Sequence, residues 1–462
     1  MALATRRTLV MEHIRRRIRS RVLGSGDKLP SVRGLASRLG VSPSTVVEAY
    51  DVLAAEGVIF ARRGSGFFVA DRVQPFVVSQ TGPQLEREID PLWVARQSID
   101  AGDNMAKPGC GWMPADWMPV ESLRRAMRRV ARSEGSLLTD YCSAQGHSGL
   151  RGHVARMLCG QGIELGPDTV LLTNSGSQAL DLICRLLLKP GDTVLVDDPC
   201  YFNFQALLRA HQITIVSVPY TPSGPDLAVF ESVLRKERPR LYLTNSALHN
   251  PTGATIAAAT AHRVLSLAEA YDLRIVEDAI FSEFEPNLSP RLASLDGLNR
   301  VLTIGSFSKT LSASLRCGYI AARPDWIAAL TDLQVATSFG GPSPTVSELL
   351  YSALTDGSYR KHMEALRDKL DRARANSMTE LATLGIRPFV MPRGGFYLWC
   401  ELPDGKDAAK VARAGLQHNV VFAPGNVFSP TQSKNSFLRF NVSQMTENTH
   451  VTILRELMSA AQ

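Results

Sequence analysis

A single lysine in a short polar turn is the residue of this chain best suited to covalent chemistry. The turn, Gly305-Ser306-Phe307-Ser308-Lys309-Thr310, lies between the apolar runs 301–304 and 318–322, and Arg316 follows the lysine by seven residues. Lysine side chains are usually exposed to solvent, because burial of their charge costs free energy. Burial also lowers the pKa of the amine, which can then form a Schiff base with a carbonyl cofactor. The flanking hydroxyls and arginine indicate such chemistry beside a bound phosphate; an ordinary lysine in a strand-exit loop is the alternative.

The lysine turn follows one of seven apolar, β-branched runs that are mostly separated by helical stretches. This alternation predicts an α/β body with a mainly parallel sheet. Ligands of such sheets collect beyond the carboxyl ends of the strands, so residues that follow the runs are candidates for a site. The runs are 169–172, 193–196, 214–218, 240–243, 274–276, 301–304 and 318–321.

Polar residues suited to one flat, phosphorylated ligand follow four of these runs. Ser175-Gly176-Ser177-Gln178 opens a helix whose amides and hydroxyls can bind phosphate. Tyr201 can stack on a ring, Asn250 can donate to a phenolate oxygen, and Asp278 can hold a pyridinium proton. Each residue also has an ordinary structural explanation. The serine turn and Asp278 can be helix N-caps, Tyr201 can be a packing residue, and Asn250 can belong to an Asn-Pro turn.

The order of these residues along the chain resembles the fold-type I aminotransferase family, across about residues 98–462. The lysine turn resembles the Schiff-base motif of these pyridoxal 5'-phosphate (PLP) enzymes. The resemblance implies a large domain with a mixed, mainly parallel seven-stranded sheet and a smaller α+β domain. It also implies that Lys309 forms the Schiff base, Asp278 pairs with the pyridine nitrogen, Asn250 contacts the phenolate and Tyr201 stacks on the ring.

The same resemblance assigns the remaining contacts of the cofactor and of its ligand. Tyr141, before Gln145-Gly146-His147, matches a tyrosine that reaches the phosphate of the partner subunit, which implies a homodimer. Arg439 matches an arginine that binds a substrate α-carboxylate through two parallel bonds; a surface ion pair is its ordinary alternative. The implied phosphate ligands are Gly176, Ser177, Gln178, Ser306, Ser308 and Arg316.

Two departures from the family pattern bear on activity. Family enzymes usually have a tyrosine three residues after the ring aspartate, where this chain has Phe281. Without that hydroxyl, we expect a higher proton affinity of the bound cofactor and poorer turnover. Tyr141 is followed by Cys142-Ser143-Ala144 where Gly-Asp-Pro is common, which leaves the path of that loop open.

The excess positive charge of the chain lies at its N-terminus. The whole chain has 51 Lys and Arg and 44 Asp and Glu, a net charge of +7. Residues 1–72 hold 13 of the basic and 6 of the acidic residues, which is also +7, so the rest is neutral. Positive charge concentrated on a small domain indicates a polyanionic partner, most often nucleic acid.

The basic segment carries the pattern of a winged helix. Ser31 and Ser42 are predicted N-caps of two short helices separated by Gly40-Val41, a helix-turn-helix arrangement. Residues 58–69 then give two strands around an Arg-Gly-Ser-Gly turn. Residues 8–71 resemble a GntR-type winged helix through 29–36, 45–50 and 64–66. The resemblance implies a buried Tyr50, and it implies that the DNA contacts are Arg33, Ser44, Thr45, Arg63 and Gly66.

A winged helix joined to an aminotransferase-like body resembles the MocR subfamily of GntR regulators. We expect a DNA-binding domain at 1–71, a linker at 72–97 and a PLP-binding body at 98–462. The expected function is a PLP-dependent transcription regulator that binds double-stranded DNA and an amino acid or amine effector. One alternative is an active aminotransferase with an accessory DNA-binding head; another is a head that only dimerises.

Composition limits the setting in which the protein works. The seven cysteines, which are scattered and form no CxxC pair, indicate reduced thiols and predict neither a disulfide framework nor a metal site. We find no apolar run long enough to cross a bilayer and no secretory leader at the N-terminus. We therefore expect a cytoplasmic protein.

Overall fold

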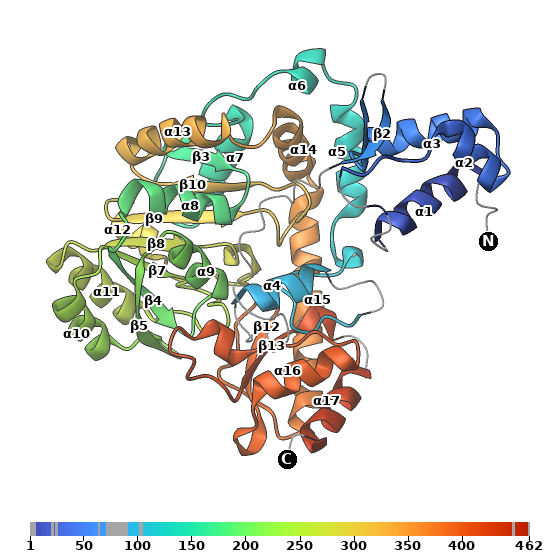
Figure 1. The fold of residues 1–462 in the computed structure, drawn as a ribbon. Helices are drawn as coiled ribbons and strands as arrows, with labels where there is room; N and C mark the ends of the chain where they lie inside the picture. The colour runs from blue at the N-terminus through green and yellow to red at the C-terminus, as the bar shows by residue number, and fades with distance from the viewer. Residues whose placement is uncertain are drawn as a thin grey trace. The chain divides into compact units, whose positions relative to one another are not determined.

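The computed structural model describes residues 6–19, 23, 26–62, 65–70, 91–100, 105–445 and 449–460. Contacts divide the chain into two compact units, Met1–Glu86 and Arg87–Gln462, which we call the head and the body. Each unit has a hydrophobic core of its own, and helices and strands of both units are labelled in Figure 1.

The head contains three helices and a two-stranded hairpin. The helices are α1 (Arg6–Arg19), α2 (Val32–Leu39) and α3 (Pro43–Ala55), and the strands are β1 (Ile59–Arg62) and β2 (Gly66–Val69). Ser31 and Ser42 cap α2 and α3 by accepting bonds from Gly34 N and Thr45 N, as predicted. Gly40 ends α2 with a φ of 63°, a left-handed conformation that favours glycine. The winged-helix prediction is therefore confirmed.

The core of the head lies between α3 and the hairpin. Tyr50 is fully buried, its ring packs edge-on against Phe67, and its hydroxyl donates to Pro30 O at 2.9 Å. Leu53, Val46 and Ile59 fill the same core. Tyr50 is thus a core residue, as the resemblance implied.

Helix α4 (Pro91–Asp100) begins inside the segment predicted as a linker. It packs against α9 (Phe202–Ala210), and Trp93 and Val94 join the core of the body. Pro91 stands at the first helical position, where the missing N–H of proline costs nothing. The rest of the segment before α4 lies outside the described residues, and the boundaries at 71, 72, 97 and 98 stay predictions.

The large part of the body is built on an eight-stranded sheet with the order β3-β10-β9-β8-β7-β4-β5-β6. Neighbouring strands from β9 to β5 are parallel, whereas β10 is antiparallel to both of its neighbours and β6 to β5. Seven strands coincide with the predicted runs, and the two-residue β6 is added at the edge. The strands are β3 (Val170–Thr173), β4 (Thr193–Asp198), β5 (Thr214–Thr221), β6 (Gly224–Pro225), β7 (Leu241–Thr244), β8 (Arg274–Asp278), β9 (Val301–Ser306) and β10 (Gly318–Ala321).

Helices cover both faces of this sheet. Leu172, Leu195 and Tyr242 point to one face, and Leu171, Val194 and Leu241 to the other, because successive side chains of a strand alternate. The first face is covered by α5 (Val120–Val130), α7 (Ser148–Cys159), α10 (Leu227–Glu237), α11 (Ala258–Ala270), α12 (Leu292–Asp296) and α14 (Pro344–Thr355). The second is covered by α8 (Gly176–Leu187), α9 and α13 (Pro324–Ser338) (Figure 1).

The small part of the body is an antiparallel four-stranded sheet with the order β11-β12-β14-β13. Its strands are β11 (Arg387–Pro388), β12 (Tyr397–Glu401), β13 (Ala423–Pro424) and β14 (Phe437–Asn441). The long helix α15 (Ser358–Ala382), with α16 (Ala408–Gln417) and α17 (Thr449–Ala460), packs on this sheet. A short helix, α6 (Gly135–Thr139), precedes α7 in the large part. The predicted body fold is confirmed.

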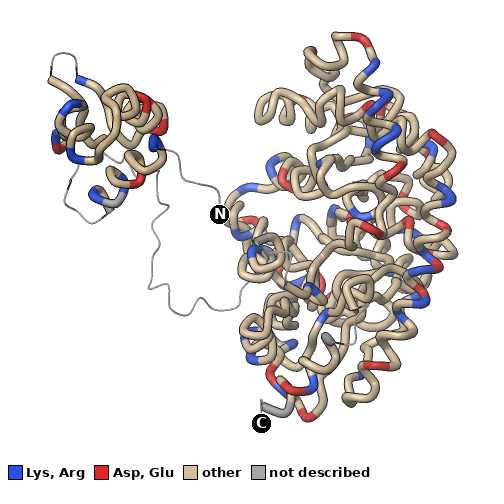
Figure 2. The backbone as a smooth tube through the Cα atoms, turned by 90° about the vertical axis from the view of Figure 1, so that its right-hand side faces the viewer, with Lys and Arg blue, Asp and Glu red and all other residues tan. Residues whose placement is uncertain are grey.

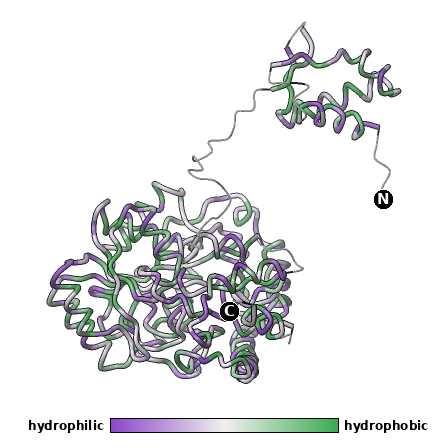
Figure 3. The backbone as a smooth tube through the Cα atoms, turned by 60° about the horizontal axis from the view of Figure 1, so that its bottom comes forward, coloured by the Kyte–Doolittle hydropathy of each residue, from purple (hydrophilic) through white to green (hydrophobic). Residues whose placement is uncertain are grey.

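Basic and acidic residues are interspersed along the backbone of the body (Figure 2), and apolar positions recur along its helices among polar ones (Figure 3). Within the described residues, no helix is both long and apolar enough to cross a membrane. The described residues also hold no cluster of three His, Cys, Asp or Glu side chains that could bind a metal ion.

Candidate functional site

Helix α8 presents its N-terminus to the end of β9. Ser175 caps the helix, and its side chain accepts a hydrogen bond from Gln178 N at 3.0 Å. The amides of Gly176 and Ser177 have no acceptor within the helix, because they belong to its first turn. Gly318 allows the close approach of the helix to β10, since a Cβ there would lie 2.7 Å from Gly176 N. The geometry leaves a helix N-terminus that can bind an anion.

The turn after β9 lies beside this N-terminus. A Cβ on Gly176 would lie 3.9 Å from Ser306 Cβ. Ser306 Oγ donates to Cys317 O at 3.0 Å and accepts from Ser308 N at 3.2 Å, which fixes the turn. Arg316 follows with a φ of 46°. Two hydroxyls and a helix N-terminus are thus brought together, as the sequence predicted.

Lys309 points into the interior of the body. Its Nζ donates to Gly111 O at 2.6 Å. Burial is the main cause that lowers the pKa of the Lys309 amine from 10.5 to about 8, and the nearby charges of Arg439 and Arg316 contribute to the decrease. An amine with this pKa is partly neutral near physiological pH, which is the form that attacks a carbonyl.

Asp278 ends β8 with its carboxylate buried. Oδ1 accepts from Ile280 N at 3.1 Å, and the backbone carbonyl accepts from Asn245 Nδ2 at 3.0 Å. Burial raises the pKa of Asp278 to about 6, although the charge of Lys309 opposes the rise. Among the described residues no cationic side chain forms an ion pair with it, so the carboxylate can pair with a cationic group of a ligand.

Arg439 on β14 and Asn250 after β7 are brought together, although they are 189 residues apart in the chain. Arg439 Nη1 donates to Asn250 Oδ1 and Nη2 donates to Gly109 O, both at 2.9 Å. The guanidinium is only 1% exposed and lies 4.1 Å over the ring of Tyr397. The surface ion pair that was the alternative for Arg439 is wrong, because the side chain is buried and bonded to an amide and a carbonyl.

Aromatic rings form a wall around these groups. Burial raises the pKa of the Tyr201 and Tyr397 hydroxyls, and the nearby charge of Arg439 opposes the rise in both. Phe281 is 4% exposed and packs edge-on against Tyr397 and Phe396. Position 281 thus presents a ring without a hydroxyl, and the centroid of this ring lies 5.4 Å from that of Tyr397.

Tyr141 lies on the surface of the body and not among the buried residues of the site. It is 78% exposed, and its ring contacts Phe339, which is 67% exposed. The loop that follows is closed locally, because Ser143 Oγ donates to Gly146 O at 2.6 Å and Gly146 N donates to Ser143 O at 2.8 Å. The structure thus supplies the path that the Cys-Ser-Ala departure left open.

Sequence reasoning missed several residues of the site. The carbonyls of Gly109 and Gly111 accept from Arg439 and Lys309, and Asn245 holds the end of β8. Backbone carbonyls have no signature in a sequence, so only the fold could reveal the first two. Tyr397 stands in an aromatic run, Gly395-Phe396-Tyr397, that could have been weighed as a wall of the site.

The head offers a second candidate site at the start of α3. Ser44 is exposed, and Ser42 Oγ lies 2.8 Å from both Ser44 Oγ and Thr45 Oγ1. Arg33 is exposed on α2. Gly66 is exposed at the start of β2 with a φ of 102°, and Arg63 lies outside the described residues. Their contacts with DNA stay a prediction.

Both the head and the body match models of known protein families. Residues 113–457 match the model of aminotransferase class I and II, and residues 7–69 match that of bacterial regulatory proteins of the gntR family. The chain belongs to the aminotransferase class I and II family. Its head is a GntR DNA-binding domain, and the pairing of this head with an aminotransferase body agrees with the predicted MocR subfamily.

Individual relatives are of two kinds. An uncharacterised HTH-type transcriptional regulator of Escherichia coli, YjiR, is 30% identical and covers 96% of each chain. A 2-aminoadipate transaminase of Thermus thermophilus is 30% identical over 72% of this chain and 85% of the transaminase. The crystal structure of the aminotransferase LysN from the same organism matches 80% of this chain and 95% of LysN, with a TM-score of 0.73 and 26% identity. The full-length likeness is thus to a regulator and the partial likeness to an enzyme.

Proposed function

We propose that this protein is a transcription regulator that binds double-stranded DNA through its GntR head and holds PLP in its aminotransferase body. The observation that carries the proposal is the convergence of Lys309, Asp278 and Arg439 in a chain that also carries a winged helix. Relatives that share the whole layout bear the names of transcriptional regulators, which supports the same function. Such a protein works with DNA in the cytoplasm.

The residues of the site fit PLP. The free amides of Gly176 and Ser177 suit its phosphate, together with Gln178, Ser306, Ser308 and Arg316. The buried Asp278 has no cationic partner among the described residues and suits a protonated pyridine nitrogen. Lys309 would hold the cofactor through Nζ, Tyr201 would stack on its ring and Asn250 would contact its phenolate. When bound, PLP supplies an electron-accepting ring for amino-group chemistry. LysN, the structural neighbour, carries a phosphopyridoxyl compound.

The effector is an amino acid or amine. Arg439 is held in place by Asn250 and Gly109, and a buried guanidinium is suited to a carboxylate that docks with two bonds. Its Nε has no acceptor in the described residues, which leaves a donor for the ligand. An effector changes DNA binding only if it binds two arrangements of the protein with different affinity.

The exposed aromatic pair of Tyr141 and Phe339 supports a homodimer, in which Tyr141 would reach the site of the partner subunit. Rings of this size are uncommon on a free surface and are typical of interfaces. Light scattering would test this assembly, and Tyr141→Phe would test the contact through the affinity for PLP.

A gel shift with random double-stranded DNA across salt concentrations tests DNA binding, since phosphate contacts make affinity fall as salt rises. Absence of a shift at low salt would support the alternative of a head that only dimerises. Lys309→Ala tests the cofactor site: the visible absorbance of bound PLP is expected to disappear. A visible band that persisted with bound cofactor would refute the assignment of Lys309.

The second candidate function is an active aminotransferase with an accessory head. The likeness to the 2-aminoadipate transaminase and the complete set of Lys309, Asp278 and Arg439 favour it, whereas Phe281 speaks against it. Single-turnover spectra with a panel of amino acids separate the two functions. Regeneration with a keto acid at ordinary enzyme rates would refute a body that only senses.

A further inference from the structure

Helix α5 carries a row of arginines that the candidate cofactor site does not use. Residues 120–130 contain four arginines and one acid, although the chain after residue 72 is neutral overall. The apolar face of the helix, with Ala126 and Val130, packs on the body. The arginines on its other side are exposed, and Arg132 extends the row just beyond the helix: Arg124, Arg125, Arg128, Arg129 and Arg132.

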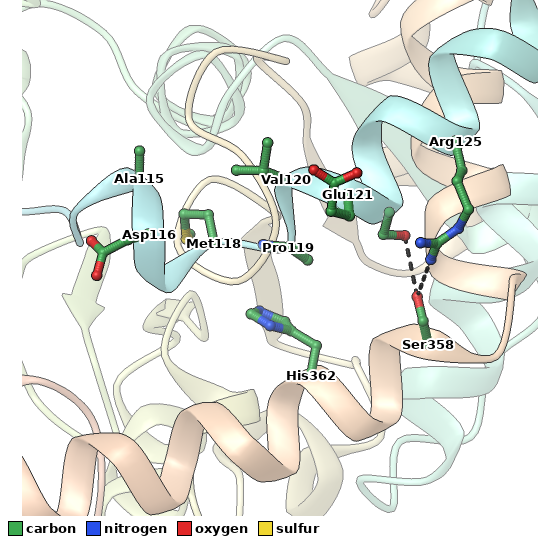
Figure 4. A pocket seen from close by; sticks show the side chains of 10 residues that line it. Ala115, Asp116, Met118, Pro119, Val120, Glu121, Arg125, Ser358 and His362 are labelled. Carbon is green, nitrogen blue, oxygen red and sulfur yellow. Dashed lines mark hydrogen bonds between the residues drawn. The ribbon is translucent and has the colours of Figure 1, made fainter.

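Among the described residues, acidic partners are found for only the first two arginines of the row. Arg124 pairs with Glu121 at 2.6 Å, and Arg125 pairs with Asp356 at 3.0 Å. Arg125 also donates to Ser358 Oγ at 3.3 Å, which anchors it at the rim of a neighbouring pocket (Figure 4). In the described part of the chain, no ion pair involves the other three, Arg128, Arg129 and Arg132.

These three unpaired arginines border a hollow of about 450 Å³, whose lining is completed by Arg125 and Ser133. Like charges four residues apart on a helix repel one another, so the row opposes folding of α5. Arg128 and Arg129 gain from the helix dipole, because they stand in the last turn, but this gain does not extend to the whole row. An anion in the hollow would remove the repulsion.

We propose that the arginines that line the hollow, on α5 and just after it, form a second DNA-binding surface, which contacts phosphates of the same duplex that the head holds: Arg125, Arg128, Arg129 and Arg132. Every basic residue of α5 is arginine, and the planar guanidinium binds phosphate oxygens with two bonds. The head and this surface belong to one chain, so a duplex bound by the head stays at high local concentration around the body. The inference rests on the proposed DNA-binding function of the head.

The test compares the salt dependence of DNA binding in the full-length protein and in the variant Arg128→Gln, Arg129→Gln, Arg132→Gln. Two random duplexes are used, one long and one so short that the head alone covers it. On the long duplex, loss of three phosphate contacts is expected to lower the slope of log affinity against log salt by about 2.7. On the short duplex the slope is expected to stay unchanged.

Two matched variants serve as controls. Arg235→Gln, Lys236→Gln, Arg413→Gln removes three exposed charges elsewhere on the body and is expected to leave both slopes as in the wild type. Arg128→Lys, Arg129→Lys, Arg132→Lys keeps the charge and is expected to keep most of the slope. If the triple glutamine variant does not fold, the single variant Arg132→Gln replaces it, because Arg132 lies outside the helix. This variant is expected to lower the slope by about 0.9.

The outcomes separate this inference from the function on which it rests. If the wild type binds neither duplex at low salt, the proposed DNA binding fails. If the wild type binds both and the arginine variant has the same slope on the long duplex, the second surface is refuted, and a partner other than DNA would have to explain the row. An equal loss on both duplexes would also refute it, because that result indicates a general effect of net charge.

Discussion

The pH dependence of cofactor capture by Lys309 follows directly from the burial of its amine. The pKa of this amine is lowered from 10.5 to about 8, and Nζ is held by Gly111 O. At pH 7, about a tenth of such amines are neutral, against about 0.03% for an ordinary lysine, a difference of roughly 300-fold in the reactive form. We expect covalent capture of PLP to be faster than capture by a free lysine side chain by a comparable factor.

Stopped-flow absorbance after mixing the cofactor-free protein with PLP measures this rate. Below pH 8 the rate constant is expected to rise about tenfold per pH unit, and above about pH 9 it is expected to level off. N-acetyl-lysine, measured in parallel, accounts for the ionisations of PLP itself. Lys309→Ala is the control that should show no covalent capture.

A rate that continued to rise through pH 10 in parallel with the free lysine analogue would refute the buried-amine reasoning. Arg439→Gln gives a second check, because the guanidinium charge contributes to the lowered pKa of Lys309. The plateau of this variant is expected at higher pH than that of the wild type. A plateau at unchanged pH would mean that the charge of Arg439 does not contribute to the lowered pKa of Lys309.

Three further predictions follow from buried groups. Burial raises the pKa of Glu283 from 4.5 to about 7. The contribution of this group to the free energy of unfolding is therefore present below pH 4.5 and is lost as pH rises through 7, a loss of about 3 kcal/mol. Glu283→Gln should flatten the pH dependence of the free energy of urea unfolding between pH 5 and 8, and an unchanged pH profile would contradict this. Phe281→Tyr restores a phenol beside the cofactor and should lower the pH at which its visible band converts. Tyr50→Phe removes the bond to Pro30 O and should destabilise the head by about 1 kcal/mol in thermal melts, with DNA affinity unchanged below the transition.

The strands and the residues that follow them could be predicted because they depend on local pattern. Buried parallel strands read as β-branched runs, and ligand-binding residues follow such strands wherever the chain leaves the sheet. Lys309, Asp278 and Asn250 were chosen as candidates in this way, and their roles stay predictions. The two-residue β6 was missed because two residues have no periodicity, and the first residues of α4 were read as linker although Pro91 is a good first residue of a helix.

The contacts that complete the site could not be predicted, because they join segments far apart in the chain. Gly109 and Gly111 supply carbonyls from the segment that follows α4, and Tyr397 comes from the small sheet. Nothing in their local sequence distinguishes them from other glycines and aromatics. Tertiary packing alone decides which carbonyl faces a buried amine or guanidinium.

Under the proposed function, the residues that would hold PLP do not by themselves separate a sensor from an enzyme, since both would need Lys309 and Asp278. A sensor differs from an enzyme in that the binding free energy of its ligand changes the conformation of the protein. Arg439 donates to Gly109 O and Lys309 to Gly111 O, and both glycines stand between α4 and α5. A carboxylate that binds Arg439 would therefore contact a side chain that is already bonded to the segment between α4 and α5. Under the proposed function, this segment is where a change in the site would bias the DNA-binding unit.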